Sequence, residues 1–369
     1  MITPTTTGPR RPSVLLRAAA AGTALVLLAS APAAAGRAST ATVAQPVAGG
    51  LAFPAAFTFA PDGRIFYGER FTGEIRVLDP ATGQDTLFFT LPAVATSGEQ
   101  GLLGLALHHR YPRKPLVYAF YTKTGPQNLI VRIRDSGGTG ADLRTLVTLP
   151  AGTIHNGGVI HFGPDRMLYA VVGEVGVPAN AQLLSTTAGK VLRMTDAGRP
   201  PRNNPFAESL VYSFGHRNMF GFAWDHLTRR LWVTENGPEC NDEVNLVVAG
   251  GNYAWGPNQT CAGSPPENTN QDGPSPRLLP EVFYGPPMIA PTGAAFCRGC
   301  GLPGQEGNLI FGAWNDGILR SLVLDAERDD VASQSILYDH PSGVLAVERG
   351  PDGALYFSDP DEIFKLVSS

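Results

Sequence analysis

Short apolar runs separated by tight polar turns recur along most of the chain. Three segments share one form, in which an apolar run, a Pro-Asp turn and a second apolar run follow one another, and they span residues 57–67, 161–169 and 347–356. Pro fixes φ and Gly readily adopts positive φ, so a Pro-Asp-Gly turn between β-rich runs is typical of a hairpin. Each segment therefore predicts two antiparallel strands joined by a short turn.

Weaker copies of the same form occur at residues 104–121, 221–234 and 293–312, which brings the number of units to six. Six units over roughly 330 residues give about 55 residues per unit, which suits a four-stranded propeller blade. A β-sandwich would not require so regular a recurrence. The sequence predicts an all-β fold, a six-bladed β-propeller of four-stranded antiparallel blades, as a single domain over residues 51–369.

The N-terminal residues 1–35 have the features of an export signal peptide. Three arginines precede an apolar stretch over residues 18–28, and small residues at 33–35 offer a cleavage site. We expect residues 36–50 to form a flexible mature N-terminus and the protein to be secreted or periplasmic. An Arg pair at 10–11 leaves both twin-arginine and ordinary export open. No later stretch approaches the roughly 18 apolar residues that span a bilayer, so we expect no stable membrane insertion.

Composition supports this class of fold. The chain has 43 Gly and 32 Pro with only 16% charged residues, which favours many tight turns over long helices. Removing the signal takes away three arginines and no acid, and this moves the formal net charge from −4 to −7. A net acidic chain without a basic stripe argues against nucleic acid as a partner.

Four cysteines fall late in the chain, and export would permit disulfides. Pairing between nearest neighbours predicts the bonds Cys240–Cys261 and Cys297–Cys300. A Cys-x-x-Cys pair also occurs in redox centres and zinc sites, but neither a βαβ context nor a second ligand pair accompanies it here.

Candidate chemistry begins at residues 155–158 (His-Asn-Gly-Gly), directly before a predicted strand. Imidazole titrates near neutral pH and Gly lets a ligand approach the backbone, so His155 is a candidate base. Polar segments at residues 215–218 and 235–239 follow at comparable positions in the repeat. Because a propeller brings its inner strand ends to one axis, these segments predict one shared site. The alternatives are a structural turn histidine and an Arg217 that braces neighbouring blades.

The chain resembles a known family through six segments in order, at residues 99–106, 155–158, 189–193, 215–218, 242–246 and 250–255. These segments are similar to those of the soluble pyrroloquinoline quinone (PQQ)-dependent sugar dehydrogenases, the glucose/sorbosone dehydrogenase group. The resemblance covers nearly all of the mature chain. It implies oxidation of an aldose at its anomeric carbon to a lactone, with PQQ and Ca²⁺ as cofactors, a small sugar as substrate and an external diffusible electron acceptor.

The resemblance also assigns site residues. His155 matches the base that takes the proton of the anomeric hydroxyl, and Glu174 matches a carboxylate that orients this base. Arg217 matches a catalytic cation beside the developing quinone oxyanion. The residues matched to cofactor contacts are Gln100, Arg217 and Asn218. The residues matched to calcium-binding backbone carbonyls, which Ca²⁺ accepts readily, are Gly237 and Pro238.

Two departures from the family concern the cofactor's three carboxylates. Members of the family place a Lys in a fifth-blade loop and Arg residues in the sixth, where this chain has Asn315 and Asp316 and the apolar residues 343–345, ending in Leu345. Each lost charged contact costs about 1.5 to 3 kcal/mol. The resemblance therefore predicts weak PQQ binding unless a nearby cation compensates. The candidates are Arg298, Arg320 and Arg349.

Two other functions fit the same fold. The first is a non-catalytic propeller that binds carbohydrate or protein, since a fold alone does not confer activity. The second is a calcium-dependent lactone hydrolase, which needs three or four ligand side chains on the axis. The loose candidates for such ligands are Glu174, Asn218 and Glu235. Clustered acids at residues 235–243 could also attract a cation. We expect three aromatic residues to pack rather than to stack on a sugar: Tyr253, Trp255 and Trp314.

Overall fold

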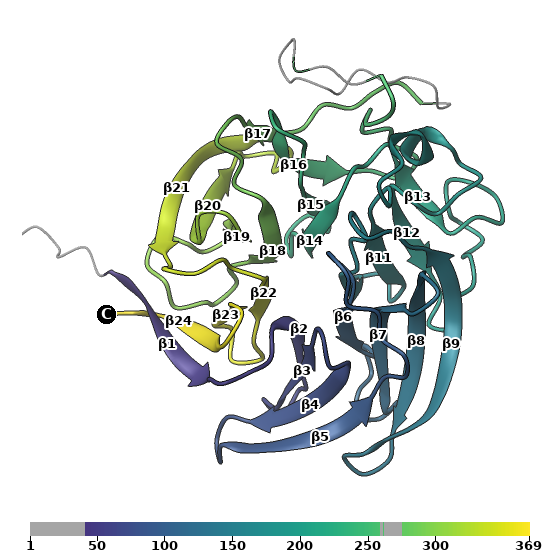
Figure 1. Ribbon diagram of the computed structural model, residues 1–369. Helices are drawn as coiled ribbons and strands as arrows, with labels where there is room; N and C mark the ends of the chain where they lie inside the picture. The colour runs from purple at the N-terminus through teal and green to yellow at the C-terminus, as the bar shows by residue number, and fades with distance from the viewer. Residues whose placement is uncertain (1–40, 259–260, 262–274) are drawn as a thin grey trace, which may run out of the picture. The chain divides into compact units, whose positions relative to one another are not determined.

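The computed structural model describes residues 41–258, 261 and 275–369. One unit spans Thr40–Ser369, and the predicted signal peptide falls in a second unit, Met1–Ser39, which lies outside the described residues. The first unit consists of six four-stranded antiparallel sheets around a central axis, which confirms the predicted six-bladed β-propeller (Figure 1). Its described helical segment is a short 3₁₀ turn, η1 (Pro178–Gln182), and the described residues include no helix suited by length and apolarity to cross a membrane.

The strands follow the sheets in chain order. The first three sheets are β2 (Pro54–Phe59), β3 (Ile65–Glu69), β4 (Glu74–Asp79) and β5 (Gln84–Thr90); β6 (Leu102–Leu107), β7 (Leu116–Lys123), β8 (Gln127–Asp135) and β9 (Gly140–Pro150); and β10 (Ile160–Phe162), β11 (Leu168–Val172), β12 (Lys190–Met194) and β13 (Val211–Phe214). The next two sheets are β14 (Met219–Trp224), β15 (Leu231–Glu235), β16 (Asp242–Val247) and β17 (Val282–Tyr284); and β18 (Pro291–Phe296), β19 (Leu309–Ala313), β20 (Ile318–Leu324) and β21 (Val331–Asp339). The sixth sheet is β22 (Ala346–Arg349), β23 (Leu355–Ser358), β24 (Ile363–Ser368) and β1 (Thr42–Ala48).

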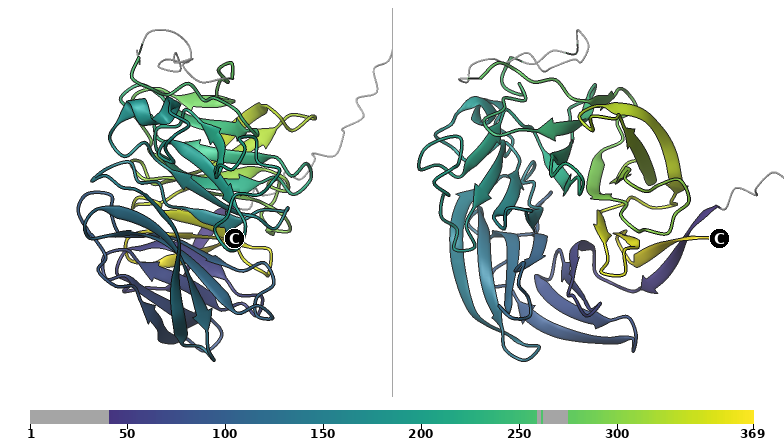
Figure 2. Two further views of the ribbon diagram at one scale, coloured as in Figure 1. Left: turned by 90° about the vertical axis from the view of Figure 1, so that its right-hand side faces the viewer. Right: turned by 180° about the vertical axis from the view of Figure 1, so that it is seen from behind.

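The sixth sheet joins the two ends of the described chain. β1 pairs antiparallel with β24, from Thr42 opposite Ser368 to Ala48 opposite Ile363, and the two strands lie side by side at the C-terminus (Figure 2). The expectation that residues 36–50 form a flexible segment is therefore wrong for residues 42–48. The partner strand lies more than 300 residues away in the sequence, so no local pattern reveals the pairing.

The predicted hairpins are present, and their turns share one geometry. The carboxylates of Asp62, Asp165 and Asp352 each accept a backbone N–H from two residues further along, at 3.1–3.2 Å. The residue after each of these aspartates has φ between 68° and 95°. At two turns that residue is Gly. At the third it is Arg166, for which a left-handed backbone conformation is sterically unfavourable.

The apolar core is divided into six clusters, and each lies between two adjacent blades. The cluster between the first two blades, for example, contains Phe66, Ile75, Ala119 and Val131, all of them buried. Since each sheet buries both faces, its strands appear as continuous apolar runs in the sequence. This packing fixes the six inner strands, β2, β6, β10, β14, β18 and β22, around the axis (Figure 1).

Both predicted disulfides are present, Cys240–Cys261 and Cys297–Cys300. The first links Cys240, which lies between β15 and β16 just after Gly237 and Pro238, to Cys261, which lies between β16 and β17; the two are 21 residues apart in the sequence. The second closes a tight turn after β18.

Candidate functional site

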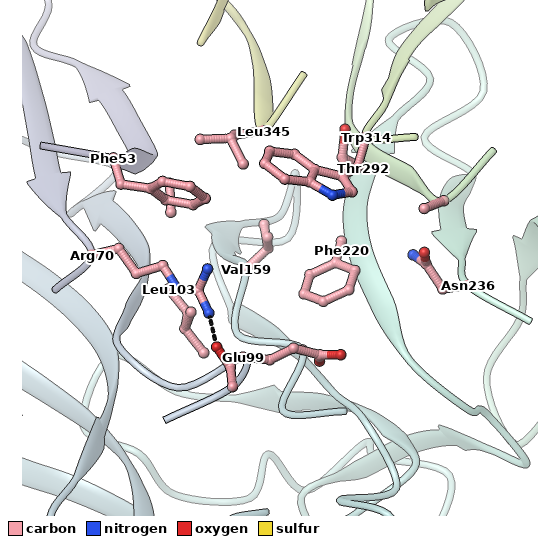
Figure 3. A pocket seen from close by; sticks show the side chains of 14 residues that line it. Phe53, Arg70, Glu99, Leu103, Val159, Phe220, Asn236, Thr292, Trp314 and Leu345 are labelled. Atoms are coloured by element: carbon pink, nitrogen blue, oxygen red, sulfur yellow. Dashed lines mark hydrogen bonds between the residues drawn. The ribbon is translucent and has the colours of Figure 1, made fainter. Parts of the chain in front are cut away.

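A cavity of about 320 Å³ lies at the axis, where the inner strands begin. Its lining comes from all six blades, so it is the point of convergence that the repeat predicts. The residues at or just before the inner strands are Phe53, Ala55, Leu103, Gly157, Val159, Phe220, Ala290, Thr292 and Leu345. Three further residues follow the second strands of their blades: Arg70, Asn236 and Trp314. Figure 3 shows Arg70, Glu99, Phe53, Leu345 and Trp314 around the same space. We call it the upper cavity.

Arg70 is a fixed cation in the upper cavity. Its guanidinium donates to the carbonyl oxygens of Gly98 at 2.5 Å and Gln100 at 3.0 Å. It also lies over the rings of Phe53 and Phe71, 5.1 and 4.8 Å from their centroids. Burial lowers the pKa of Arg70, but an arginine starts so far above neutrality that it stays charged. Its remaining N–H groups are therefore available to an anion in the cavity.

His155 lies at the edge of the upper cavity, oriented by two carboxylates. Its Nδ1 is hydrogen-bonded to Glu174, and its backbone N–H donates to Glu99 at 2.7 Å. A carboxylate on Nδ1 keeps the proton on that nitrogen and leaves Nε2 as a proton acceptor. The second oxygen of Glu174, Oε2, is buried and has no hydrogen-bond partner among the described residues. The geometry is that of a general base with its orienting acid.

Arg217 and Asn218 belong to the same network as His155. The backbone N–H of Glu174 donates to the carbonyl of Arg217 at 2.8 Å. Asn218 donates to Glu99 at 3.1 Å and accepts from the backbone N–H of Gly157 at 3.3 Å. Neither His155 nor Arg217 is part of the lining of the upper cavity, whereas Glu99 and Gly157 are. The structure therefore brings the side chains of His155 and Glu174 together, and it joins Arg217 to them through its backbone, whereas the side chain of Arg217 lines a separate small cavity.

The side chain of Arg217 points toward the segment after β15. Its Nη1 donates to the carbonyl of Asn236 at 2.9 Å, and its guanidinium lies 5.5 Å from the ring centroid of Trp255. Its backbone N–H donates to Glu235 at 2.5 Å. The sequence left open a structural role for Arg217, in which it braces neighbouring blades, and these contacts are compatible with that role. They also hold the guanidinium near Gly237.

Gln100 does not reach the upper cavity. It is 5% exposed, its Nε2 donates to the carbonyl of Gly152 at 2.9 Å, and its Oε1 accepts from the backbone N–H of Ser97 at 3.3 Å. The side chain therefore ties the loop of residues 97–100 to the segment before His155. A direct contact between Gln100 and a cofactor stays a prediction.

Gly237 and Pro238 lie in a turn held by Asp242. The carboxylate of Asp242 accepts backbone N–H groups from Gly237 at 2.9 Å and from Ile289 and Ala290, both at 2.8 Å. Burial raises the pKa of Asp242, which these backbone hydrogen bonds oppose. No hydrogen bond from another described residue reaches the carbonyl oxygen of Gly237 or Pro238. Within the described ranges neither oxygen has a donor, which is what the predicted calcium role requires.

The clustered acids near this turn have structural partners. Glu235 pairs with His216 at 2.7 Å, and Glu243 accepts from Asn245 at 3.0 Å. Within the described ranges, no group of three or more His, Cys, Asp or Glu side chains is placed to hold a metal ion. A cation here would depend on backbone carbonyls and on ligands from a cofactor.

The departures expected near the cofactor's carboxylates are visible. Leu345 lines the upper cavity. Asp316 forms an ion pair with Arg320 at 2.5 Å, and Asn315 donates to the carbonyl of Met288 at 2.9 Å. The charge of Asp316 is thus neutralised locally, and Arg320 is already engaged.

The cation in the upper cavity is one that the sequence analysis missed. Arg298 and Arg349 line a different cavity, so neither compensates for Leu345. Arg70 does line the upper cavity. The sequence signal that could have identified Arg70 is its position in the repeat: it directly follows β3, just as Trp314 directly follows β19.

The aromatic residues divide into two groups. Tyr253 and Trp255 are buried, as expected for packing residues. Trp314 is 40% exposed and lines the upper cavity, with its ring 5.9 Å from that of Phe53. Trp314 therefore offers an accessible aromatic face to a ligand.

Comparisons with known proteins agree with this architecture. The family model described as glucose / sorbosone dehydrogenase matches residues 51–367. The aldose sugar dehydrogenase YliI of Escherichia coli K12 is 29% identical over 330 residues, which cover 82% of this chain and 86% of that protein. Quinoprotein glucose dehydrogenase B of Acinetobacter calcoaceticus is 32% identical over 238 residues, covering 55% of this chain and 50% of that protein. The PQQ-bound structure of aldose sugar dehydrogenase from Streptomyces coelicolor has a TM-score of 0.77 at 31% identity and covers 89% of this chain and 98% of that chain. The chain belongs to the glucose/sorbosone dehydrogenase family.

Proposed function

We propose that the protein is an exported dehydrogenase that oxidises an aldose at its anomeric carbon to the lactone, with PQQ and Ca²⁺ as cofactors. The observation that carries the proposal is the His155–Glu174 pair at the edge of a cavity with a fixed cation and aromatic walls. The names of the E. coli, A. calcoaceticus and S. coelicolor relatives support the reaction class and the quinone.

The upper cavity fits a planar anionic cofactor. Arg70 supplies a positive charge, while Phe53, Phe220 and Trp314 supply apolar surface. Gly237 and Pro238 offer two carbonyl oxygens to calcium beside Arg217. When bound, PQQ supplies a two-electron acceptor, and an external diffusible acceptor would then take the electrons away.

Proton transfer falls to His155. Its Nε2 accepts the proton of the sugar's anomeric hydroxyl, and the carboxylate of Glu174 stabilises the imidazolium that forms. Glu99 holds both the backbone of His155 and the side chain of Asn218, so it fixes the base relative to the cavity. Arg217 would stabilise negative charge that develops beside the calcium site.

One experiment distinguishes this function from its alternatives. The mature protein is incubated with Ca²⁺ and PQQ, and reduction of a redox dye is followed with a panel of aldoses. We expect dye reduction that His155→Ala abolishes. Lactone hydrolysis without the quinone would instead identify a hydrolase, and silence in both assays by a folded protein would identify a binding module. The hydrolase lacks support among the described residues, because they contain no cluster of side-chain ligands.

Export is proposed from the N-terminal sequence, which lies outside the described residues. Expression of the full chain in a bacterial host with intact export systems should yield a periplasmic protein cleaved near residue 36. Mass spectrometry of the mature N-terminus tests this, and an uncleaved cytoplasmic protein would refute it.

A further inference from the structure

A second cavity, of about 250 Å³, lies at the opposite ends of the inner strands. We call it the lower cavity. Its lining comes from the last residues of β10, β14, β18 and β22, whereas the upper cavity is lined by residues where these strands begin. The lining residues are His161, Phe162, Phe222, Ala223, Trp224, His226, Ala294, Ala295, Phe296, Arg298, Glu348 and Arg349. The function proposed above uses none of them.

A bridge across the axis separates the two cavities. His161 Nε2 lies 3.2 Å from Glu348 Oε1. β10 belongs to the third sheet and β22 to the sixth, so the contact joins opposite sides of the ring (Figure 1). The space just above it measures only about 20 Å³ and is lined mainly by small and apolar residues. A ligand of several atoms therefore cannot pass from one cavity to the other.

The bridge contributes little charge to the lower cavity. Burial lowers the pKa of His161 to about 4 and raises the pKa of Glu348 to about 8. Both shifts favour the neutral forms at neutral pH, so the pair adds little net charge to the cavity. Burial lowers the pKa of His226, which also lines the cavity; the charge of Asp225 opposes this shift, and Arg298 and Arg328 add to it.

Two arginines give the lower cavity a positive rim. Arg298 and Arg349 are exposed, and the side chain of neither forms a hydrogen bond or ion pair with another residue in the described part of the chain. Of the neighbouring acids, Asp225 pairs with Arg328 at 2.6 Å, while Glu306 accepts only the neutral backbone N–H of Gly299, at 2.8 Å, and keeps its charge. The rim therefore carries two arginine side chains that form no ion pair within the described residues, with the charge of Glu306 close to Arg298.

The walls of the lower cavity are aromatic and ordered by mutual packing. The ring of Phe222 lies 5.0 Å from His161 and 5.3 Å from Trp224, both at T-shaped angles. The aromatic part of these walls suits a flat apolar body. Guanidinium groups at the rim suit a carboxylate.

We propose that the lower cavity binds a small carboxylate with a planar apolar body. The carboxylate is held by Arg298 and Arg349, and the body lies against Phe222 and Trp224. This site is independent of the dehydrogenase reaction, because the His161–Glu348 bridge divides the channel.

The test uses 4-fluorobenzoate as the probe, with binding to the mature protein followed by ¹⁹F NMR. We expect saturable binding that weakens at least tenfold in Arg298→Met and in Arg349→Met. The matched control is Arg144→Met, which changes an exposed arginine on the outer strand β9 and should leave the affinity unchanged. Thermal unfolding of each variant verifies that it is folded.

Four comparisons complete the experiment. Fluorobenzyl alcohol tests the need for charge, and acetate and gluconate, added as competitors of the probe, test the need for the planar apolar body; all three should bind at least tenfold more weakly. Saturating PQQ should leave fluorobenzoate binding unchanged. The proposal is overturned if the arginine variants bind the probe like the wild type, if gluconate binds as tightly, if PQQ competes, or if no saturable binding occurs. None of these outcomes depends on sugar oxidation, so the two proposals fail separately.

Discussion

Replacing Arg70 by Met tests whether this residue supplies the charge that Leu345 cannot. Met keeps a long side chain against the rings of Phe53 and Phe71 but removes the guanidinium. Two groups are affected: the cofactor's carboxylate loses a charged partner, and the carbonyl oxygens of Gly98 and Gln100 lose their donor. The first loss acts on cofactor affinity and the second on the stability of the loop.

The expected magnitude follows from the contact. A hydrogen bond to a charged group contributes about 1.5 to 3 kcal/mol. At about 1.4 kcal/mol per factor of ten, the dissociation constant of PQQ should rise by roughly 10- to 150-fold. Arg70→Lys keeps the charge but not the planar fork, so its loss should be intermediate. Solvent in the open cavity screens the interaction and favours the lower end of the range.

The assay is an equilibrium titration of the protein with PQQ at fixed Ca²⁺, followed calorimetrically and without any sugar. Arg298→Met, which changes an arginine of the lower cavity, serves as the matched control and should bind PQQ like the wild type. Wild-type affinity in a folded Arg70→Met protein would refute the role of Arg70. Parallel weakening in both variants would instead point to a nonspecific effect of net charge.

Three further changes have defined outcomes. Glu174→Gln should lower kcat for dye reduction by about 10²- to 10⁴-fold at saturating PQQ, because the base loses its orienting carboxylate; wild-type turnover would contradict the assigned pair. Glu348→Gln should flatten the dependence of unfolding free energy on pH between pH 6.5 and 8 in urea titrations. Since the folded pKa of Glu348 is about 8 against an ordinary 4.5, the unfolded chain releases this proton first, and wild-type stability should fall as pH rises toward 8. Below about pH 6.5 the lowered pKa of His161 has the opposite effect on stability and offsets that of Glu348. The decline in wild-type stability, at most about 1.4 kcal/mol per pH unit, is therefore expected between pH 6.5 and 8. An unchanged slope in the variant would refute the raised pKa of Glu348. Arg166→Gly should raise the free energy of unfolding by about 0.5 to 1 kcal/mol by relieving a φ of 68°, and a loss of stability would show that the arginine's contacts matter more than its backbone.

The fold could be predicted because its signals are local and repeated. A Pro-Asp turn with a positive φ at the following residue specifies a hairpin wherever it occurs, as at Asp62 and Asp352. β1 escaped prediction because its strand is specified by pairing with β24 at the other end of the chain. Its sequence, interrupted by Pro46, lacks the apolar continuity of a strand buried on both faces.

The site could be predicted only in part, because contacts across blades depend on the geometry of the whole ring. The His155–Glu174 pair followed from a resemblance in order and spacing, and the structure brings the two side chains into contact. Arg320 looked available in the sequence, yet it pairs with Asp316 four residues away. Arg70 comes from the first blade, far in sequence from the loops where a compensating cation was expected.

The closed channel also constrains how the proposed reaction proceeds. Because His161 and Glu348 meet across the axis, the upper cavity cannot exchange ligands of several atoms through the lower one. In the proposed reaction, sugar, lactone and electron acceptor would therefore all use the opening of the upper cavity, which Phe53 and Trp314 line. The residues around this space of about 320 Å³ would hold the cofactor and the sugar, so product release and access of the acceptor would share one route. The bridge that makes the lower cavity a separate site thus limits the upper cavity to exchange at one end.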